Sequence, residues 1–237
     1  MCLMNPINNF SSPVLAVDST QAPLRVALLC GEKVYRVSRR GVKQEEYLFP
    51  AVRALVEKAG IGLGDIKKVC VLRGPGRFTG IRIGLTFASM LHELNGADVY
   101  AETVFTALAK QTARTRDYTR WKKANPSGRI AVVLHAFRSE YFCQFFEPGR
   151  AEPRWLSLDE LKAYLAAETA PLYVTGRGEN GAVLNSLLPG FHHAPKSSSL
   201  LDTAVFARDC VMGNPAEVPV GPLYLKPARF EMTGSGR

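Results

Sequence analysis

The chain has 237 residues, of which 46% are hydrophobic and 22% charged, with 30 Lys and Arg against 21 Asp and Glu. This composition is typical of a globular protein and excludes a disordered or fibrous chain. No apolar stretch approaches the roughly 20 residues that span a bilayer, and residues 1–12 lack the pattern of a signal peptide. We therefore expect a flexible N-terminal extension over 1–12 and a cytoplasmic protein without membrane contact.

Cysteine and histidine usage argues against metal chemistry. The five cysteines are odd in number and widely spaced, and there are only four histidines. Such spacing favours reduced, buried thiols over a disulfide framework or a zinc site. The sequence predicts no metal and no other cofactor.

In the first half, apolar runs predict strands over 14–17, 24–30 and 34–38. A helix follows over 45–59, where apolar residues recur at helical spacing although Pro50 could kink it. A strand over 67–73, a helix over 79–94 and a strand over 98–103 come next.

The second half begins with a helix over 105–115, and a break at 125–128 separates it from strands over 129–137 and 139–147. A helix over 157–168, opened by Ser157 or Asp159, a strand over 172–176 and a helix over 203–212 complete the pattern. This order predicts an α/β protein with an N-terminal lobe over 13–112, a basic linker over 113–128, a C-terminal lobe over 129–230 and a tail over 231–237. The last helix could pack back on the first lobe, and no sequence repeat connects the halves.

A glycine-rich turn, RGPGRFTGIRIGL over 73–85, lies between a strand and a helix, where phosphate loops occur. A Walker loop is excluded because no Gly-Lys pair follows. The dinucleotide fingerprint fits poorly, because the third glycine comes one residue late and Pro75 removes an amide donor. A dehydrogenase using this loop, with Glu102 on the ribose, remains the weaker alternative to a tight turn.

The helix after the turn has an unusually wide apolar surface. Ile83, Phe87, Met90 and Leu94 form one stripe, and a second apolar stripe lies nearly opposite. A surface helix normally shows an apolar arc of about 100°. This helix is therefore either sandwiched inside its own fold or part of a protein interface.

The segment from Lys110 to Arg129 contains seven basic residues and one acidic residue. It is either a solvated helix end or an RNA-facing patch in which aromatic side chains stack on bases. The candidate RNA contacts are Arg114, Arg116, Arg120, Trp121, Lys122 and Lys123, with Tyr118 interleaved.

GPGRFTGIRIGLTFASML closely resembles the GPGSFTGLRIG signature of the TsaB (YeaZ) family, the non-catalytic partner in bacterial synthesis of threonylcarbamoyladenosine on tRNA. VLAVDST resembles the family's opening strand, SEYFCQFF its later hairpin and PLYLKPARF its C-terminal segment. The resemblance covers about residues 13–112 strongly and 129–230 loosely. Arg77 stands where the family has Ser, and His135 and Phe137 stand where it has Asp and Arg.

The resemblance implies the two-lobed fold with mixed sheets shared by actin, heat-shock chaperones and sugar kinases (ASKHA), with a degenerate nucleotide site and no catalysis of its own. A glycoprotease-like activity would need a nucleophile–base pair or a metal, and a nucleotide-binding ASKHA enzyme is the other alternative. Residues implied for the vestigial nucleotide site are Asp18, Ser19, Thr20, Gly176 and Gly178. For Asp18, capping of its own turn is the competing interpretation.

The implied partners are TsaD in a heterodimer, the ATPase TsaE, a second copy when the chain is alone, and tRNA mainly through the complex. Implied interface residues are Leu48, Val52, Leu55, Ile83, Gly84, Phe87, Met90 and Leu94. The signature turn comprises Gly74, Pro75, Gly76, Phe78, Thr79, Gly80 and Arg82. On this basis Phe87→Glu is expected to abolish pairing with TsaD without unfolding the chain.

Overall fold

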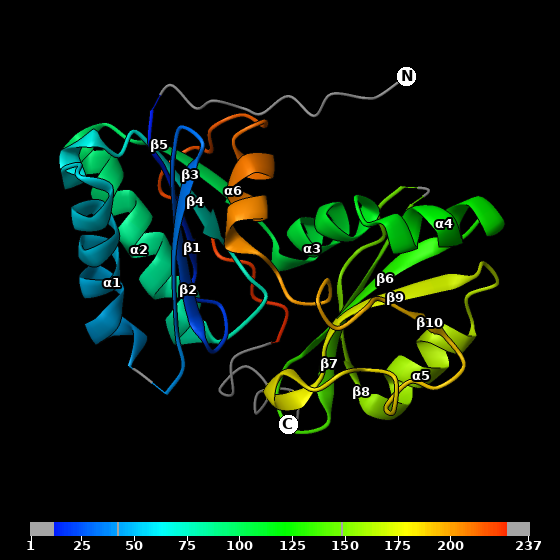
Figure 1. The fold of residues 1–237 in the computed structure, drawn as a ribbon. Helices are drawn as coiled ribbons and strands as arrows, with labels where there is room; N and C mark the ends of the chain where they lie inside the picture. The colour runs from blue at the N-terminus through cyan, green and yellow to red at the C-terminus, as the bar shows by residue number, and fades with distance from the viewer. Residues whose placement is uncertain (1–11, 42, 148, 227–237) are drawn as a thin grey trace, which may run out of the picture. The chain divides into compact units, whose positions relative to one another are not determined.

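The computed structural model describes residues 12–41, 43–147 and 149–226, in two compact units (Figure 1). Among the described residues, the first unit contains those up to Val104 and returns with Asp202–Pro222, and the second contains Phe105–Leu201 and residues 223–226. The N-terminal extension and the tail expected over 231–237 lie outside the described residues, apart from position 12.

The first unit is built on a mixed five-stranded sheet in the order β3-β2-β1-β4-β5. Strands β1, β2 and β3 form an antiparallel meander, and β4 and β5 run parallel to β1. Their bounds are Val14–Asp18 (β1), Leu24–Cys30 (β2), Lys33–Arg39 (β3), Lys68–Leu72 (β4) and Asp98–Glu102 (β5). The central strand β1 is buried throughout because helices cover both faces of the sheet.

Helices α1 (Gln44–Ala59) and α2 (Phe78–Asn95) cover one face of this sheet, and α6 (Thr203–Cys210) covers the other (Figure 1). Gly60 and Gly96 end α1 and α2 in the left-handed conformation, which glycine adopts without the steric cost of a Cβ. A 3₁₀ turn, η1 (Leu63–Asp65), leads into β4. Pro50 lies inside α1, which begins at Gln44 and therefore continues through the proline.

The second unit has a mixed five-stranded sheet in the order β10-β9-β6-β7-β8. Its strands are β6 (Arg129–His135), β7 (Glu140–Phe146), β8 (Arg154–Ser157), β9 (Leu172–Arg177) and β10 (His192–His193). Helices α3 (Val104–Ala113) and α4 (Arg116–Ala124) lie along one face and α5 (Leu158–Ala166) along the other (Figure 1). Ser157 caps α5 in a capping box with Glu160, and η2 (Glu179–Gly181) follows β9.

Taken in the order β8-β7-β6-β9-β10, the second sheet repeats the topology of the first sheet, β3-β2-β1-β4-β5. Strands β6, β7 and β8 form an antiparallel meander like β1, β2 and β3. Strands β9 and β10 then add in parallel beside β6, as β4 and β5 add beside β1. The two units are therefore built on one strand plan, although their sequences show no repeat.

Two expected boundaries differ from the structure, and two short strands were not predicted. The residues expected as a basic linker over 113–128 form α4, which Thr115 caps by accepting a hydrogen bond from the Tyr118 amide. The division between units falls at Val104 and Phe105 instead. Strands β8 and β10 were not predicted, because elements of four and two residues carry too little alternation to recognise.

The α/β class and the mixed sheets predicted from the sequence are confirmed. Helix α6, the last helix within the described residues, belongs to the first unit and packs on β1 and β2. Within the described residues, the helices are all too short or too polar to span a membrane.

Candidate functional site

Glycines spaced four residues apart bring the signature turn against the turn after β1. A Cβ on Gly80 would lie 2.0 Å from the Ser19 carbonyl oxygen, and one on Gly76 would lie 2.4 Å from the Thr20 carbonyl oxygen. Gly84 would place its Cβ 2.5 Å from the Ser19 hydroxyl oxygen. Real Cβ atoms do not approach oxygen this closely, so the three glycines allow direct contact between α2 and the Ser19–Thr20 turn.

Hydrogen bonds hold the same contact. The Arg77 amide donates to the Thr20 carbonyl at 2.7 Å, and the Ser19 hydroxyl donates to the Gly80 carbonyl at 2.8 Å. On the other side of the turn, the Gly74 carbonyl accepts from the Val104 amide at 2.8 Å. Gly74 has a φ of 113°, which a side chain would strain, so the Gly74-Pro75-Gly76 segment is a packed structural turn.

Asp18 is bonded within the first unit through both carboxylate oxygens. Its Oδ1 accepts from the Thr20 amide at 3.2 Å and from the Thr20 hydroxyl at 2.7 Å. Its Oδ2 accepts from Arg25 at 3.0 Å in a largely buried ion pair. This arrangement matches the capping interpretation of Asp18.

The two glycines implied for the vestigial nucleotide site, Gly176 and Gly178, differ in how tightly they are packed. Gly176 has a φ of 115°, and a Cβ there would lie 2.0 Å from the Val133 carbonyl oxygen on the paired strand β6. The nearest atom to a Cβ on Gly178 would be 3.5 Å away, an ordinary contact. Strand geometry therefore requires glycine at 176 but not at 178.

Arg77 occupies the N-cap of α2, and its side chain makes no capping hydrogen bond. In the family signature this position is Ser, a residue whose hydroxyl caps helices well. Arginine also puts a positive charge at the positive end of the helix dipole. The departure at Arg77 thus costs the helix a cap.

We expect Arg77→Ser to raise the free energy of unfolding by about 1 kcal/mol, the usual value of an N-cap hydrogen bond. Urea denaturation followed by circular dichroism measures this change. Arg77→Ala is the control, because it removes the charge without supplying a cap, and it should recover only a minor part of the gain. Equal stability of the Ser and Ala variants would contradict the capping argument.

The predicted interface residues separate into core and surface. Leu48, Val52, Leu55 and Phe87 are at most 7% exposed and belong to the hydrophobic core of the first unit, and Gly84 packs on Ser19. One apolar stripe of α1 and α2 therefore covers the sheet, although Leu48 and Phe87 also reach the pocket between these helices, and their role in an interface stays a prediction. Ile83 and Met90 are partly exposed and Leu94 is exposed.

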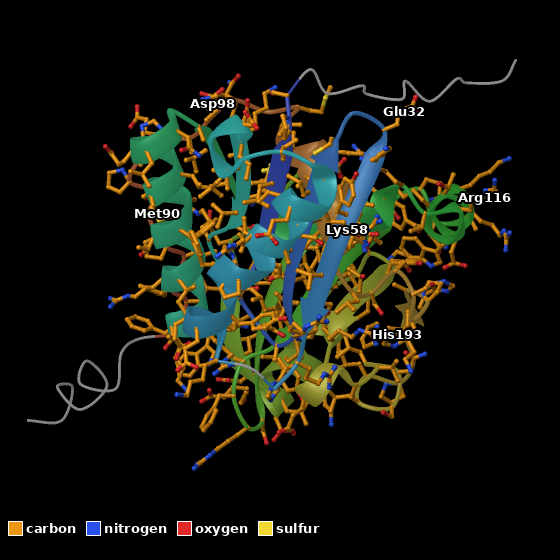
Figure 2. The ribbon with its side chains drawn as sticks, turned by 60° about the vertical axis from the view of Figure 1, so that its left-hand side comes forward. Glu32, Lys58, Met90, Asp98, Arg116 and His193 are labelled. Atoms are coloured by element: carbon orange, nitrogen blue, oxygen red, sulfur yellow. The ribbon has the colours of Figure 1, made fainter. Side chains whose placement is uncertain are left out.

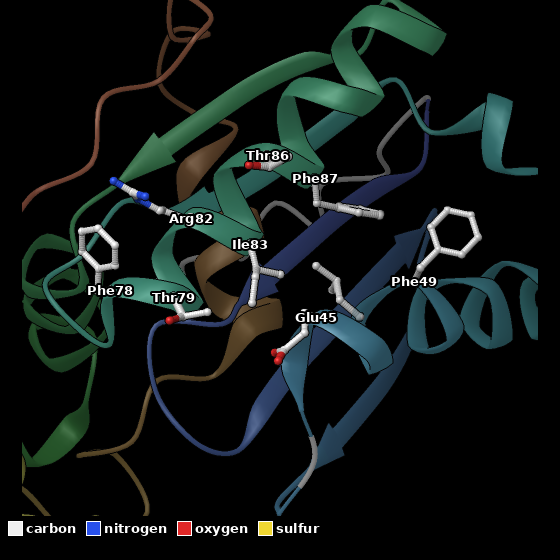
Figure 3. Close-up of a pocket in the computed structure, with 9 residues that line it drawn as sticks. Glu45, Phe49, Phe78, Thr79, Arg82, Ile83, Thr86 and Phe87 are labelled. Atoms are coloured by element: carbon white, nitrogen blue, oxygen red, sulfur yellow. The ribbon is translucent and has the colours of Figure 1, made fainter.

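A surface pocket of about 450 Å³ lies between α1 and α2 (Figure 3). Phe49, which the sequence analysis missed, and Phe78 line it and are 48% and 51% exposed. The Phe49 ring meets the Phe87 ring edge-on at 6.4 Å, and the Arg82 guanidinium lies 3.9 Å from the centre of the Phe78 ring. We call this surface the α1–α2 face; its remaining lining residues are Glu45, Leu48, Thr79, Ile83 and Thr86.

Helix α4 turns its aromatic side chains inward, not toward solvent. Tyr118 is 3% exposed, and its hydroxyl donates to Glu147 at 2.7 Å. The Trp121 ring packs against Tyr173 at 5.2 Å and against His192 at 6.0 Å. Both rings therefore attach α4 to its own unit, and their stacking on RNA bases stays a prediction.

The departures at His135 and Phe137 lie at the β6–β7 hairpin. His135 hydrogen-bonds the Arg138 carbonyl at 2.7 Å, and Phe137 is 48% exposed. The Lys226 ammonium lies 5.5 Å from the centre of the Phe137 ring and 5.1 Å from that of Trp155, and it pairs with Glu140. The hairpin thus holds the lysine of the PLYLKPARF segment.

Two thiols of the described residues, those of Cys70 and Cys143, are buried. Burial raises the pKa of Cys143 to about 12 and raises that of Cys70 well above its usual value. A protonated, buried thiol is a poor nucleophile and a poor metal ligand. Among the described residues, no three His, Cys, Asp or Glu side chains come together as a metal site.

Comparisons with known proteins agree with the signature. The sequence profile of the family described as "TsaD: tRNA N6-adenosine threonylcarbamoyltransferase" matches residues 42–144. The protein from Bacillus subtilis named "tRNA threonylcarbamoyladenosine biosynthesis protein TsaB" is 34% identical over 80 residues, which are 33% of this chain and 35% of that protein. The protein of the same name from Buchnera aphidicola is 24% identical over 134 residues, which are 56% and 57% of the two chains.

The fold has a close counterpart among solved structures. YeaZ from Pseudomonas aeruginosa superimposes with a TM-score of 0.61 and 24% identity, over 90% of this chain and 100% of that one. The matches span 35% and 57% of the length of the Bacillus subtilis and Buchnera aphidicola proteins. The chain is thus similar to several TsaB sequences over part of its length, and it shares the fold of YeaZ.

Proposed function

We propose that this chain is a non-catalytic subunit in the biosynthesis of threonylcarbamoyladenosine on tRNA. In this role it pairs with a TsaD-family protein, which transfers threonylcarbamoyl to the adenosine next to the anticodon. TsaE is proposed as a further partner, and a second copy of the chain as the occupant of the same surface when TsaD is absent. The names of the TsaB relatives and the TsaD-family profile over residues 42–144 support this proposal.

The observation that carries the pairing proposal is the α1–α2 face. Phe49 and Phe78 are large apolar side chains of this face, on two neighbouring helices, with 48% and 51% exposure. Aromatic side chains around a pocket are the usual anchors of a protein interface, because they bury much area for little lost rotamer entropy. Arg82 and Glu45 at the pocket supply charges of both signs, which could fix the register of a partner helix.

A scaffold role also agrees with the way the signature turn is used. The three glycines Gly76, Gly80 and Gly84 and the Asp18 carboxylate are all engaged in contacts within the first unit. Packing therefore explains the residues that first suggested a phosphate loop. We propose accordingly that the chain turns over no nucleotide by itself.

Reconstitution tests this function. A TsaD-family protein, TsaE, threonylcarbamoyl-adenylate and an unmodified tRNA transcript are incubated with and without this chain, and modified adenosine is measured by mass spectrometry of the tRNA digest. We expect modification only when the chain is present, and a stable complex with the TsaD-family protein on gel filtration. Modification at equal rates without the chain would refute the proposal, as would ATP or NAD turnover by the chain alone.

A further inference from the structure

Helix α4 presents a cationic face on its outer side. At 100° per residue, Arg116, Arg120 and Lys123 fall within an arc of about 60° on one side of the helix. All three side chains are exposed, and among the described residues none of them forms an ion pair with a carboxylate. Figure 2 shows Arg116 on α4, where nitrogen-tipped side chains extend outward from the helix.

Other basic residues of the segment are used within the second unit. Lys122 donates to the Gly128 carbonyl at 2.6 Å and lies 3.4 Å from Glu147. Arg129 pairs with Glu168 at 2.7 Å and lies over the Phe145 ring. The structure therefore separates Lys122, a candidate RNA contact from the sequence, from the exposed charges of Arg116, Arg120 and Lys123.

The inner side of α4 is firmly attached. Tyr118 and Trp121 lie opposite the cationic face and pack against Tyr173. The Tyr173 hydroxyl donates to Asp117 at 2.7 Å, and this hydrogen bond holds the pKa of Asp117 below its usual range. The acidic residue of the helix is thus bonded to its own sheet, and the helix holds its three outer cations in a fixed pattern.

We propose that Arg116, Arg120 and Lys123 form a phosphate-binding face for RNA. The choice of RNA rests on the proposed function, in which the substrate is tRNA, and on the net charge of +9 of the whole chain. Three cations spaced along about 10 Å of one helix side suit a row of backbone phosphates. Because the aromatic rings of α4 are turned inward, the contact is electrostatic and independent of base sequence.

The test is binding of the full chain to a fluorescently labelled, unmodified tRNA transcript, measured by anisotropy at several salt concentrations. In the test variant, Arg116, Arg120 and Lys123 are all replaced by Gln. The matched control replaces Lys33, Arg40 and Lys162 by Gln, which removes the same charge from exposed positions elsewhere. A second control, Trp121→Phe, alters a proposed stacking residue while keeping an aromatic ring.

We expect the α4 variant to bind tRNA about tenfold or more weakly at low salt, and to lower the slope of log affinity against log salt by about three. The Lys33, Arg40 and Lys162 control should keep the slope within about one of the wild-type value, and Trp121→Phe should keep it unchanged. Wild-type affinity in the α4 variant would overturn the inference, as would equal losses in both triple variants. The α4 variant could instead lose binding to poly-L-glutamate while its tRNA binding stays intact. That result would assign the face to an acidic protein and would also overturn the inference.

Pairing with the TsaD-family protein is measured on the same variants by gel filtration. The α4 variant should pair normally, because the α1–α2 face is unchanged. Normal pairing with undiminished tRNA binding would refute the RNA face alone. A different result would refute the proposed function alone. In that case the wild-type chain pairs with no TsaD-family protein, but the α4 variant still loses tRNA binding.

Discussion

Replacing Phe49 and Phe78 together by Glu should abolish pairing with a TsaD-family protein, with affinity at least about 100-fold lower. Two aromatic anchors of an interface typically contribute 2 kcal/mol or more each, and every 1.4 kcal/mol changes the affinity tenfold. The two rings are 48% and 51% exposed, so the charges enter solvent in the free chain and not the core. Isothermal titration calorimetry or co-purification measures the loss.

The control for this variant is Met212→Glu. Met212 is 70% exposed in the first unit, just after α6 and outside the α1–α2 face. The Met212→Glu substitution adds a carboxylate to an exposed apolar position, and pairing should stay as in the wild-type chain. Unchanged co-purification of the Phe49 and Phe78 double variant would show that the interface lies elsewhere.

The structure also changes which variant is informative. Apolar periodicity and the family resemblance favoured Phe87→Glu, but Phe87 is 7% exposed and part of the core of the first unit. A carboxylate there would be buried without a partner, which destabilises a fold strongly. Loss of pairing in Phe87→Glu would therefore report unfolding as readily as a lost contact.

Gly80→Ala should lower the free energy of unfolding by about 3 kcal/mol, a large effect for adding one methyl group. The added Cβ would lie 2.0 Å from the Ser19 carbonyl oxygen and 2.9 Å from the Gln44 side-chain oxygen. The Ser19 carbonyl is main chain at the end of the central strand β1, so it has little freedom to move. The hydrogen bond from the Ser19 hydroxyl to the Gly80 carbonyl would be strained at the same time.

Gly64→Ala is the control for this prediction. A Cβ on Gly64 meets no atom within 4 Å, and we expect a change within about 0.5 kcal/mol, as for an ordinary surface substitution. Urea denaturation of both variants gives the comparison. A similarly small effect of Gly80→Ala would mean that the signature glycine serves something other than packing, such as the close approach of a ligand.

The strands and helices of the first unit were predictable because each carries a strong local signal. Strands β1, β2 and β4 consist mostly of apolar residues. The apolar residues of α1 recur at helical spacing, and the helix stops at Gly60. Helix α4 was mistaken for a linker because most of its nine residues are polar and it lacks a regular apolar stripe. It is helical because Thr115 caps it and because Tyr118 and Trp121 pack on Tyr173, a contact that only the folded unit provides.

The candidate site was predicted in part. The wide apolar arc of α2 is a sequence property, but its division between core and surface depends on where the sheet lies. Phe49 was missed because it is one of several apolar residues on α1, and only packing shows that it stays exposed while Leu48 is buried. Periodicity specifies how residues are arranged around a helix, not which side meets the sheet.

The sequence by itself determined the α/β class, most element positions and the signature of the TsaB (YeaZ) family, because these depend on local periodicity and on short motifs. Tertiary structure alone decided the common strand plan of the two sheets and the inward orientation of the α4 aromatic side chains. It also decided why the signature segment needs its glycines. Gly76, Gly80 and Gly84 are small because they face Ser19 and Thr20, some 56 to 65 positions earlier in the chain. Contacts between residues so far apart arise from folding and leave no local pattern from which they can be read.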